Sequence, residues 1–170
     1  IYVAAASSIF TSTASGAGFG PLQRVPQFTQ NGFYFFTHPY IRQDGTEIYV
    51  ANTFFSVGDI RVASVSGGTV GEPSILDIGS VGRNRSFVVT PDGLTGFYST
   101  DREGDAGGPY QIWRVNRAST SLPFSSASAV VELRATGAND PTWISNDGCR
   151  LYFESNRSGT MNTYVAERAP

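Results

Sequence analysis

The chain has 170 residues, of which 40% are hydrophobic and 15% are charged, a composition that excludes an intrinsically disordered polypeptide. Its net charge of −2 comes from 12 basic and 14 acidic residues that are scattered singly, so there is no basic stripe for nucleic acid. No apolar run approaches a transmembrane helix in length, and none has helical spacing for long, so the sequence predicts an all-β fold of short strands and turns.

The N-terminal segment begins with an apolar run and not with methionine, which indicates a processed protein or an internal piece of a longer one. Residues 1–4 repeat residues 48–51 letter for letter, and residues 22–25 echo residues 112–115. We therefore expect the second strand of a repeat unit over residues 1–4 and its third strand over residues 22–25. The serine-rich residues 7–20 between them are expected to form a long loop.

From residue 39 onward, three segments share a pattern in which an apolar residue stands four positions before an Asp-Gly pair: residues 39–52, 87–100 and 141–155. Aspartate can bond back to the backbone of a tight turn, and glycine readily takes the positive φ that a hairpin turn needs. Each pair therefore predicts a hairpin turn. We assign a structural role in these turns to Asp44, Gly45, Asp92, Gly93, Asp147 and Gly148.

The strand after each turn is apolar on both faces, which is typical of a sheet sandwiched between neighbours. Third strands are expected over residues 59–62, 111–115 and 163–166, and weaker fourth strands over residues 74–78 and 130–133.

Four-stranded units that recur about every 50 residues predict a β-propeller, with about 3.5 blades present as part of a larger ring. The first unit lacks its first strand and the last unit lacks its fourth. The expected divisions of this one propeller domain are a partial blade over residues 1–38, blades over residues 39–85 and 86–139, and a partial blade over residues 140–170.

The repeats resemble those of the TolB-type propeller family of bacterial periplasmic and secreted proteins. The likeness is clearest in DPTWISNDGCRLYFESNRSGTMNTYVAER, residues 140–168, and the preceding copy keeps TPDG, STDR and IWRV. The first copy departs, because Thr53-Phe54-Phe55 stands where the others carry Ser-Asp/Asn-Arg. The resemblance implies a propeller in a periplasmic or extracellular location. It implies little about function, since this fold carries scaffolds, lectins and enzymes.

Loops between second and third strands differ in length and should leave the propeller on one face, where such variation often marks a binding surface. We expect a protein or glycan to bind there. The candidate contact residues are Phe10, Phe19, Phe54, Phe55, Arg102 and Arg157. For Arg102 and Arg157, which follow Asp101 and Asn156 at one repeat position, a bond network that locks neighbouring blades is the favoured alternative.

Few residues have the pattern of a chemical site. Asp101, Glu103 and Asp105 could hold Ca²⁺, but too few ligands are visible, and a solvated loop is favoured. His38 and Cys149, the only residues of their types, fall in different repeats, which argues against a catalytic pair. Propeller enzymes that resemble this repeat, such as oligogalacturonate lyases, rely on histidine-rich metal sites. The sequence therefore predicts no catalytic residue, no resident metal and no cofactor.

Three hypotheses follow. The first is a non-catalytic, extracytoplasmic binding or scaffold propeller that recognises a protein or glycan through its loop face. The alternative is a fragment of a propeller enzyme, or of a propeller gating a peptidase, with the catalytic residues outside this chain. A structural hypothesis adds that the missing blades come from the rest of the polypeptide or from another chain, because half-blades leave strand edges unpaired.

Overall fold

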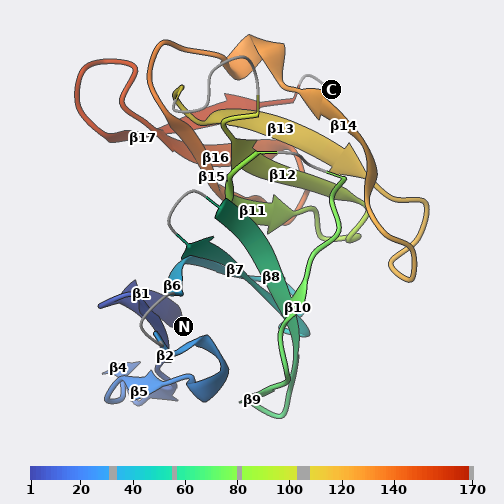
Figure 1. Cartoon of the computed structure of the whole chain (residues 1–170). Helices are drawn as coiled ribbons and strands as arrows, with labels where there is room; N and C mark the ends of the chain where they lie inside the picture. Colours follow the sequence, from blue (N-terminus) through green and yellow to red (C-terminus); the bar gives the residue numbers. More distant parts are fainter. Residues whose placement is uncertain (31–33, 55–56, 80–81, 103–107, 169–170) are drawn as a thin grey trace.

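The computed structural model describes residues 1–30, 34–54, 57–79, 82–102 and 108–168. In this part of the chain, four main antiparallel sheets follow one another in sequence order, the first two in the lower part of Figure 1 and the last two side by side in its upper part. The chain is thus built as successive blades of a β-propeller, and the predicted fold class is confirmed. No helix among the described residues is long and apolar enough to cross a membrane.

The sheets are meanders, apart from short additions to the first two. The first sheet has the order β1-β2-β5, with β1 (Tyr2–Ala5), β2 (Ser8–Thr11) and β5 (Gln23–Arg24), beside a hairpin of β3 (Ala14–Ser15) and β4 (Gly18–Phe19). The second contains β6 (Phe35–Ile41), β7 (Glu47–Phe54), β8 (Val57–Ser66) and β10 (Ser74–Ile75), and β9 (Thr69–Val70) also pairs with β8. The third contains β11 (Asn84–Val89), β12 (Thr95–Thr100), β13 (Gln111–Asn116) and β14 (Ser125–Ala129), and the fourth β15 (Asn139–Ile144), β16 (Arg150–Ser155) and β17 (Asn162–Glu167).

Both faces of the middle sheets are buried. In β7, Ile48, Tyr49 and Val50 are all fully buried, so successive residues on opposite faces are dry, as the sequence predicts. One apolar cluster joins the second, third and fourth sheets, and a second cluster joins the first and second. The aromatic ring of Phe87 lies at the centre of the larger cluster, 4.8 Å from Tyr49 and 5.6 Å from Phe124 between ring centroids.

The innermost strands β6, β11 and β15 share an irregularity. Their pairing with the second strand shifts at the same level of each sheet, next to His38, Ser86 and Pro141. His38 and Ser86 both have positive φ, at 50° and 57°. A bulge bends a strand and re-aims its side chains, so the same device recurs in three successive sheets.

Three of the expected secondary-structure assignments are wrong: the loop over residues 7–20, the third strand over residues 22–25 and the fourth strand over residues 130–133. Residues 7–20 do not form one loop, because β2 pairs with β1 through a tight turn at Ala6 and Ser7, both with positive φ. The Ser7 carbonyl accepts a hydrogen bond from Phe36 N, just as the Tyr110 carbonyl before β13 accepts one from Asn139 N. β2 is therefore the third strand of its unit, and β5 takes the outer position that the repeat gives to a fourth strand.

The expected fourth strand over residues 130–133 is also wrong. The fourth strand of that sheet is β14, and Val131–Leu133 form the 3₁₀ turn η2 after it. The other 3₁₀ turn, η1 (Pro26–Phe28), follows β5 and buries Phe28. β14 reads Ser-Ser-Ala-Ser-Ala, a sequence with little apolar signal, so the valines beyond it misled the assignment.

The packing of Phe87 gives the first prediction. A Cβ atom on Gly96, which lies across the sheet, would come within 2.5 Å of the Phe87 ring. Since Tyr49 and Phe124 hold that ring, we expect Gly96→Ala to lower the free energy of unfolding by about 1–3 kcal/mol, as overpacking does. Urea denaturation would measure this.

Gly18→Ala in β4 is the matched control, because a Cβ there meets nothing within 4 Å and should change stability little. Equal stabilities of the two variants would contradict the packing argument.

Candidate functional site

The three Asp-Gly turns have one hydrogen-bond pattern. Oδ1 of Asp44, Asp92 and Asp147 accepts from the backbone N–H two residues later, at 3.0, 2.9 and 2.9 Å. The same oxygen also accepts from a nearby hydroxyl, those of Thr46, Thr90 and Ser145 respectively. Gly45, Gly93 and Gly148 have φ of 73°, 74° and 69°. All six residues thus form closely matched turns.

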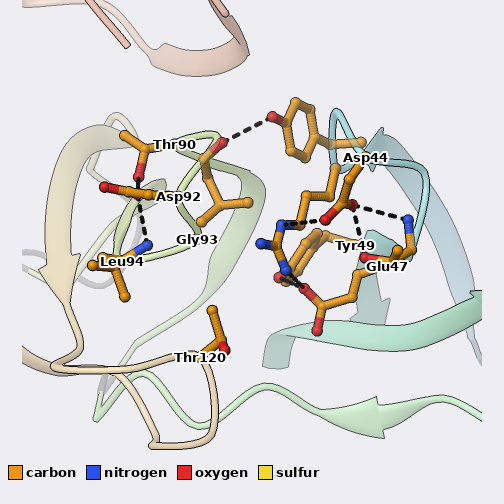
Figure 2. A network of polar contacts seen from close by, with 12 residues as sticks. Asp44, Glu47, Tyr49, Thr90, Asp92, Gly93, Leu94 and Thr120 are labelled. Carbon is orange, nitrogen blue, oxygen red and sulfur yellow. Dashed lines mark hydrogen bonds and ion pairs between the residues drawn. The ribbon is translucent and has the colours of Figure 1, made fainter. Parts of the chain in front are cut away.

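Successive turns also touch one another. Figure 2 shows the Asp44 and Asp92 turns side by side, with Thr120 close to Gly93. A Cβ atom at Gly93 would come within 3.0 Å of Thr120 and 3.1 Å of the Arg42 guanidinium, which is tight, and its φ of 74° favours glycine at this position. Arg42 in turn pairs with Asp44 and Glu47.

Two further bonds tie the sheets together near this end. Gln43, which follows β6 of the second sheet, donates from Nε2 to the carbonyl of Ile144 in the fourth sheet, at 2.8 Å. Tyr40 Oη donates to the Val89 carbonyl at 2.9 Å, and burial raises the pKa of Tyr40 to about 12, so this hydroxyl remains a donor at neutral pH. The turns and these bonds form a rigid end of the propeller.

A polar cluster lies at the opposite end, where the inner strands begin. Asp140 is buried and accepts from both Arg85 Nε at 2.9 Å and Ser99 Oγ at 2.6 Å, and Arg85 Nη2 bonds its other oxygen. The Arg85 guanidinium also lies 4.1 Å from the centre of the Tyr110 ring. The fourth sheet is thereby bound to the third through a buried charge pair.

Asp101 and Asn156 do the same work at one repeat position. Oδ1 of Asp101 accepts from the Arg83 N–H at 2.8 Å, and Oδ1 of Asn156 accepts from the Ala138 N–H at 2.7 Å. Each bond links the residue after the second strand of a sheet to the residue just before the first strand of the same sheet. The other carboxylate oxygen of Asp101 pairs with Arg83 Nε at 2.7 Å. The carboxylate that the sequence offered as a calcium ligand is therefore already paired with an arginine.

The other two calcium candidates, Glu103 and Asp105, lie outside the described residues. Within the described ranges, no three His, Cys, Asp or Glu side chains are grouped as a metal site would need.

Arg102 and Arg157 are engaged inside the molecule. Arg102 stacks on Trp113 at 4.3 Å from the ring, and Arg157 lies 5.0 and 5.1 Å from the rings of Phe153 and Tyr164. Arg157 also donates to the Leu133 carbonyl and to Asn139 Oδ1, each at 2.8 Å. It thus connects the segment after β14 to the fourth sheet.

The aromatic residues of the expected loop face do not lie together. Phe19 is 67% exposed, but β4 belongs to the connection between β2 and β5, at the end that carries the Asp-Gly turns. Phe10 lies within β2, with the Arg24 guanidinium 5.5 Å from its ring. The side chain of Phe54 and all of Phe55 lie outside the described residues. The structure therefore separates Phe10 and Phe19 from Arg102 and Arg157.

His38 and Cys149 lie on different sheets and at different ends. His38 is on β6, where its Nδ1 is 2.9 Å from Thr37 Oγ1, and burial holds the pKa of His38 below its ordinary value. Cys149 is exposed beside the third Asp-Gly turn. The two side chains do not form a nucleophile–base pair.

An exposed aromatic row on the fourth sheet escaped the sequence analysis. Trp143, Tyr152 and Val165 stand opposite one another on β15, β16 and β17, and the Trp143 and Tyr152 rings are 5.3 Å apart. Trp143 is 42% and Val165 50% exposed, whereas Val88 and Tyr40, which hold the position of Trp143 in the preceding sheets, are 1% and 6% exposed. Aligning the repeats places Trp143 at a buried position, and its exposure can be inferred only by considering which sheet lies opposite it.

Comparisons with known proteins support the propeller architecture. A protein assigned as TolB from Agrobacterium tumefaciens matches with a TM-score of 0.59 and 19% identity, over 95% of this chain and 51% of that one. TolB from Acinetobacter baumannii matches with a TM-score of 0.60 and 18% identity, over 94% of this chain and 35% of that one. A thermostable family-43 glycoside hydrolase matches with a TM-score of 0.55 and 16% identity, over 99% of this chain and 73% of that one.

These similarities define the fold as TolB-like. The chain spans about half and about a third of the two TolB structures. No family model and no curated protein sequence matches the chain.

The Asp-Gly turns predict a pH dependence. Hydrogen bonds from Thr90 Oγ1 and the Leu94 N–H lower the pKa of Asp92. A carboxyl group with a lowered folded-state pKa stabilises the protein fully above its unfolded-state pKa of about 4, and that contribution is lost as the pH falls through the lowered value. Asp92→Asn keeps the acceptor oxygen but cannot titrate, so we expect its stability to decline less than wild type between about pH 5 and pH 2.

Melting temperatures across that range would measure the difference. Glu72→Gln, which removes an exposed carboxylate outside the turns, should keep the wild-type profile. Parallel profiles for wild type and Asp92→Asn would contradict this prediction.

The contacts of Arg157 predict a structural penalty. We expect Arg157→Ala to lower the free energy of unfolding by about 2–4 kcal/mol, because it leaves Asn139 Oδ1 and the Leu133 carbonyl without their charged donor. Arg157→Lys should recover only part of this, since an ammonium cannot reproduce the planar guanidinium. A purely partner-binding arginine would leave chemical denaturation unchanged in both variants.

Proposed function

We propose that this chain is a non-catalytic binding or scaffold propeller, and that a further β-sheet packs on the open face of its fourth sheet. The exposed row of Trp143, Tyr152 and Val165 carries the proposal. Tryptophan and tyrosine dominate the binding energy of protein interfaces, since each buries a large area at low entropic cost.

The preceding sheets indicate what would cover this row. Phe97 and Arg114, which stand where Tyr152 and Val165 stand, face Ile144 and Leu151 of the next sheet. Tyr40, at the Trp143 position, donates its hydroxyl hydrogen bond to the next sheet. The favoured occupant is therefore another β-sheet, from the rest of the polypeptide or from another chain.

The charge on this face adds a second requirement. Glu154 holds the position of Ser99, which donates to Asp140 of the following sheet. Glu154 is exposed, and its negative charge acts on His38 of the second sheet. A sheet that packs here would therefore complement it with a basic side chain or another donor at the start of its inner strand.

Other observations bear on the alternatives. His38 and Cys149 lie apart, so the described part of the chain holds no thiol–imidazole pair. The likeness to a glycoside hydrolase concerns the fold alone. The resemblance of the repeats to TolB supports an extracytoplasmic location.

A photo-crosslinking amino acid tests the proposal in the natural host. Placed at position 143, it should couple to a β-strand peptide that contains a basic residue, and peptide mapping would show whether that peptide belongs to the same polypeptide or to a partner. Placed at the exposed position 19, it should give no such product. Trp143→Ala, combined with a crosslinker at position 165, should reduce the yield at least about tenfold.

Three results would overturn the proposal: no peptide at position 143, equal products at positions 143 and 19, or a product made only of carbohydrate. The last result would favour the glycan over the protein.

A further inference from the structure

A cleft of about 650 Å³ opens between the third and fourth sheets, on the side of the molecule that carries the Asp92 and Asp147 turns. This volume falls within the range of small-molecule sites, which combine apolar walls with a few polar groups. The cleft is separate from the exposed row on the far face of the fourth sheet, so an inference about it is independent of the proposed function.

The walls of the cleft are mainly apolar. Phe97 and Leu133 contribute from the third sheet and the turn after it, and Ile144, Leu151 and Ala166 contribute from the fourth. These side chains belong to the same apolar cluster as the buried Val88 and Phe153. A ligand in this cleft would need an apolar body.

Arg114 breaks the repeat pattern at this cleft. It stands on β13 directly opposite Phe97, at the position that Val62 holds in the second sheet and Val165 in the fourth. A charged residue in a row that is otherwise apolar is a local inconsistency of the kind that functional sites produce. Among the described residues, its guanidinium has no ion-pair partner, in contrast to that of Arg85.

The other charges leave the cleft with an excess of one positive charge. Arg168 lines it as well, and so do two carboxylates, those of Glu132 and Glu167. Glu167 is already paired with Arg150 at 2.8 Å. Two guanidiniums therefore face one uncompensated carboxylate, and a guanidinium binds a carboxylate group through paired charge-assisted hydrogen bonds.

We propose that this cleft binds a small amphipathic carboxylate, with its apolar body against Phe97, Ile144 and Leu151 and its carboxylate on Arg114. Cys149, the only cysteine in the chain, lies at the cleft and is exposed. Its thiol is thus a built-in reporter of occupancy.

The test follows the rate at which N-ethylmaleimide modifies Cys149 in the whole chain while decanoate is added. Decanoate should slow modification at least about fivefold at saturation, and decan-1-ol should need at least about tenfold higher concentration, since it lacks the anion. Shortening the acid should weaken protection about fourfold for each methylene removed. Isothermal titration calorimetry provides a second readout.

The decisive variants are Arg114→Val and Arg24→Val. Valine occurs at the matching positions of two other sheets, so Arg114→Val should fold, and it should weaken decanoate binding at least about tenfold. Arg24→Val removes an exposed arginine from the first sheet and should leave binding unchanged. Arg114→Lys, which keeps the charge, should retain part of the affinity.

Three outcomes would overturn the inference: no protection of Cys149 by decanoate, equal protection by decan-1-ol, or equal effects of Arg114→Val and Arg24→Val. Circular dichroism of each variant shows whether a loss of binding reflects a loss of fold.

Discussion

The middle sheets of this protein have two apolar faces, and burying both requires a sheet on either side. The strand β7 shows the constraint most directly, since Ile48, Tyr49 and Val50 are buried although their side chains alternate between faces. Phe87 then fills the space between the second and third sheets against Tyr49 and Phe124. The other features of the molecule depend on this sheet-on-sheet packing, because the same requirement repeats at every junction.

The two ends of the sheets satisfy the packing in different ways. At one end, Asp-Gly turns with the same aspartate-to-backbone hydrogen bond touch each other, and the positive φ of Gly93 favours glycine there. At the other end, buried polar groups such as Asp140 and Asn139 bind the start of one sheet to the sheet before it. Such networks stabilise only when every member has a partner, which explains why Arg85, Ser99 and Arg157 all converge there.

Departures from the repeat coincide with the surfaces available for binding. Arg114 interrupts an apolar row at the point where the third and fourth sheets separate into a cleft. Glu154 stands at the repeat position of Ser99, on the face of the fourth sheet that no other described sheet covers. Elsewhere the same positions carry uncharged residues, such as Val62 at the position of Arg114 and Ser99 at that of Glu154, so the two charged residues depart from the repeat.

The sequence by itself determined the architecture and the turns, because both are local and recur: Asp-Gly pairs at similar spacing and strands that are apolar on both faces predict stacked sheets. It failed at β2 and β14, whose short, serine-containing sequences carry little periodic signal, and their pairing depends on partners elsewhere in the chain. The tertiary structure alone decided the site. Whether Trp143 is core or surface, whether Arg157 binds a partner or a carbonyl, and whether Arg114 faces a cleft depend on which sheet lies opposite, and a single repeat does not encode its neighbour.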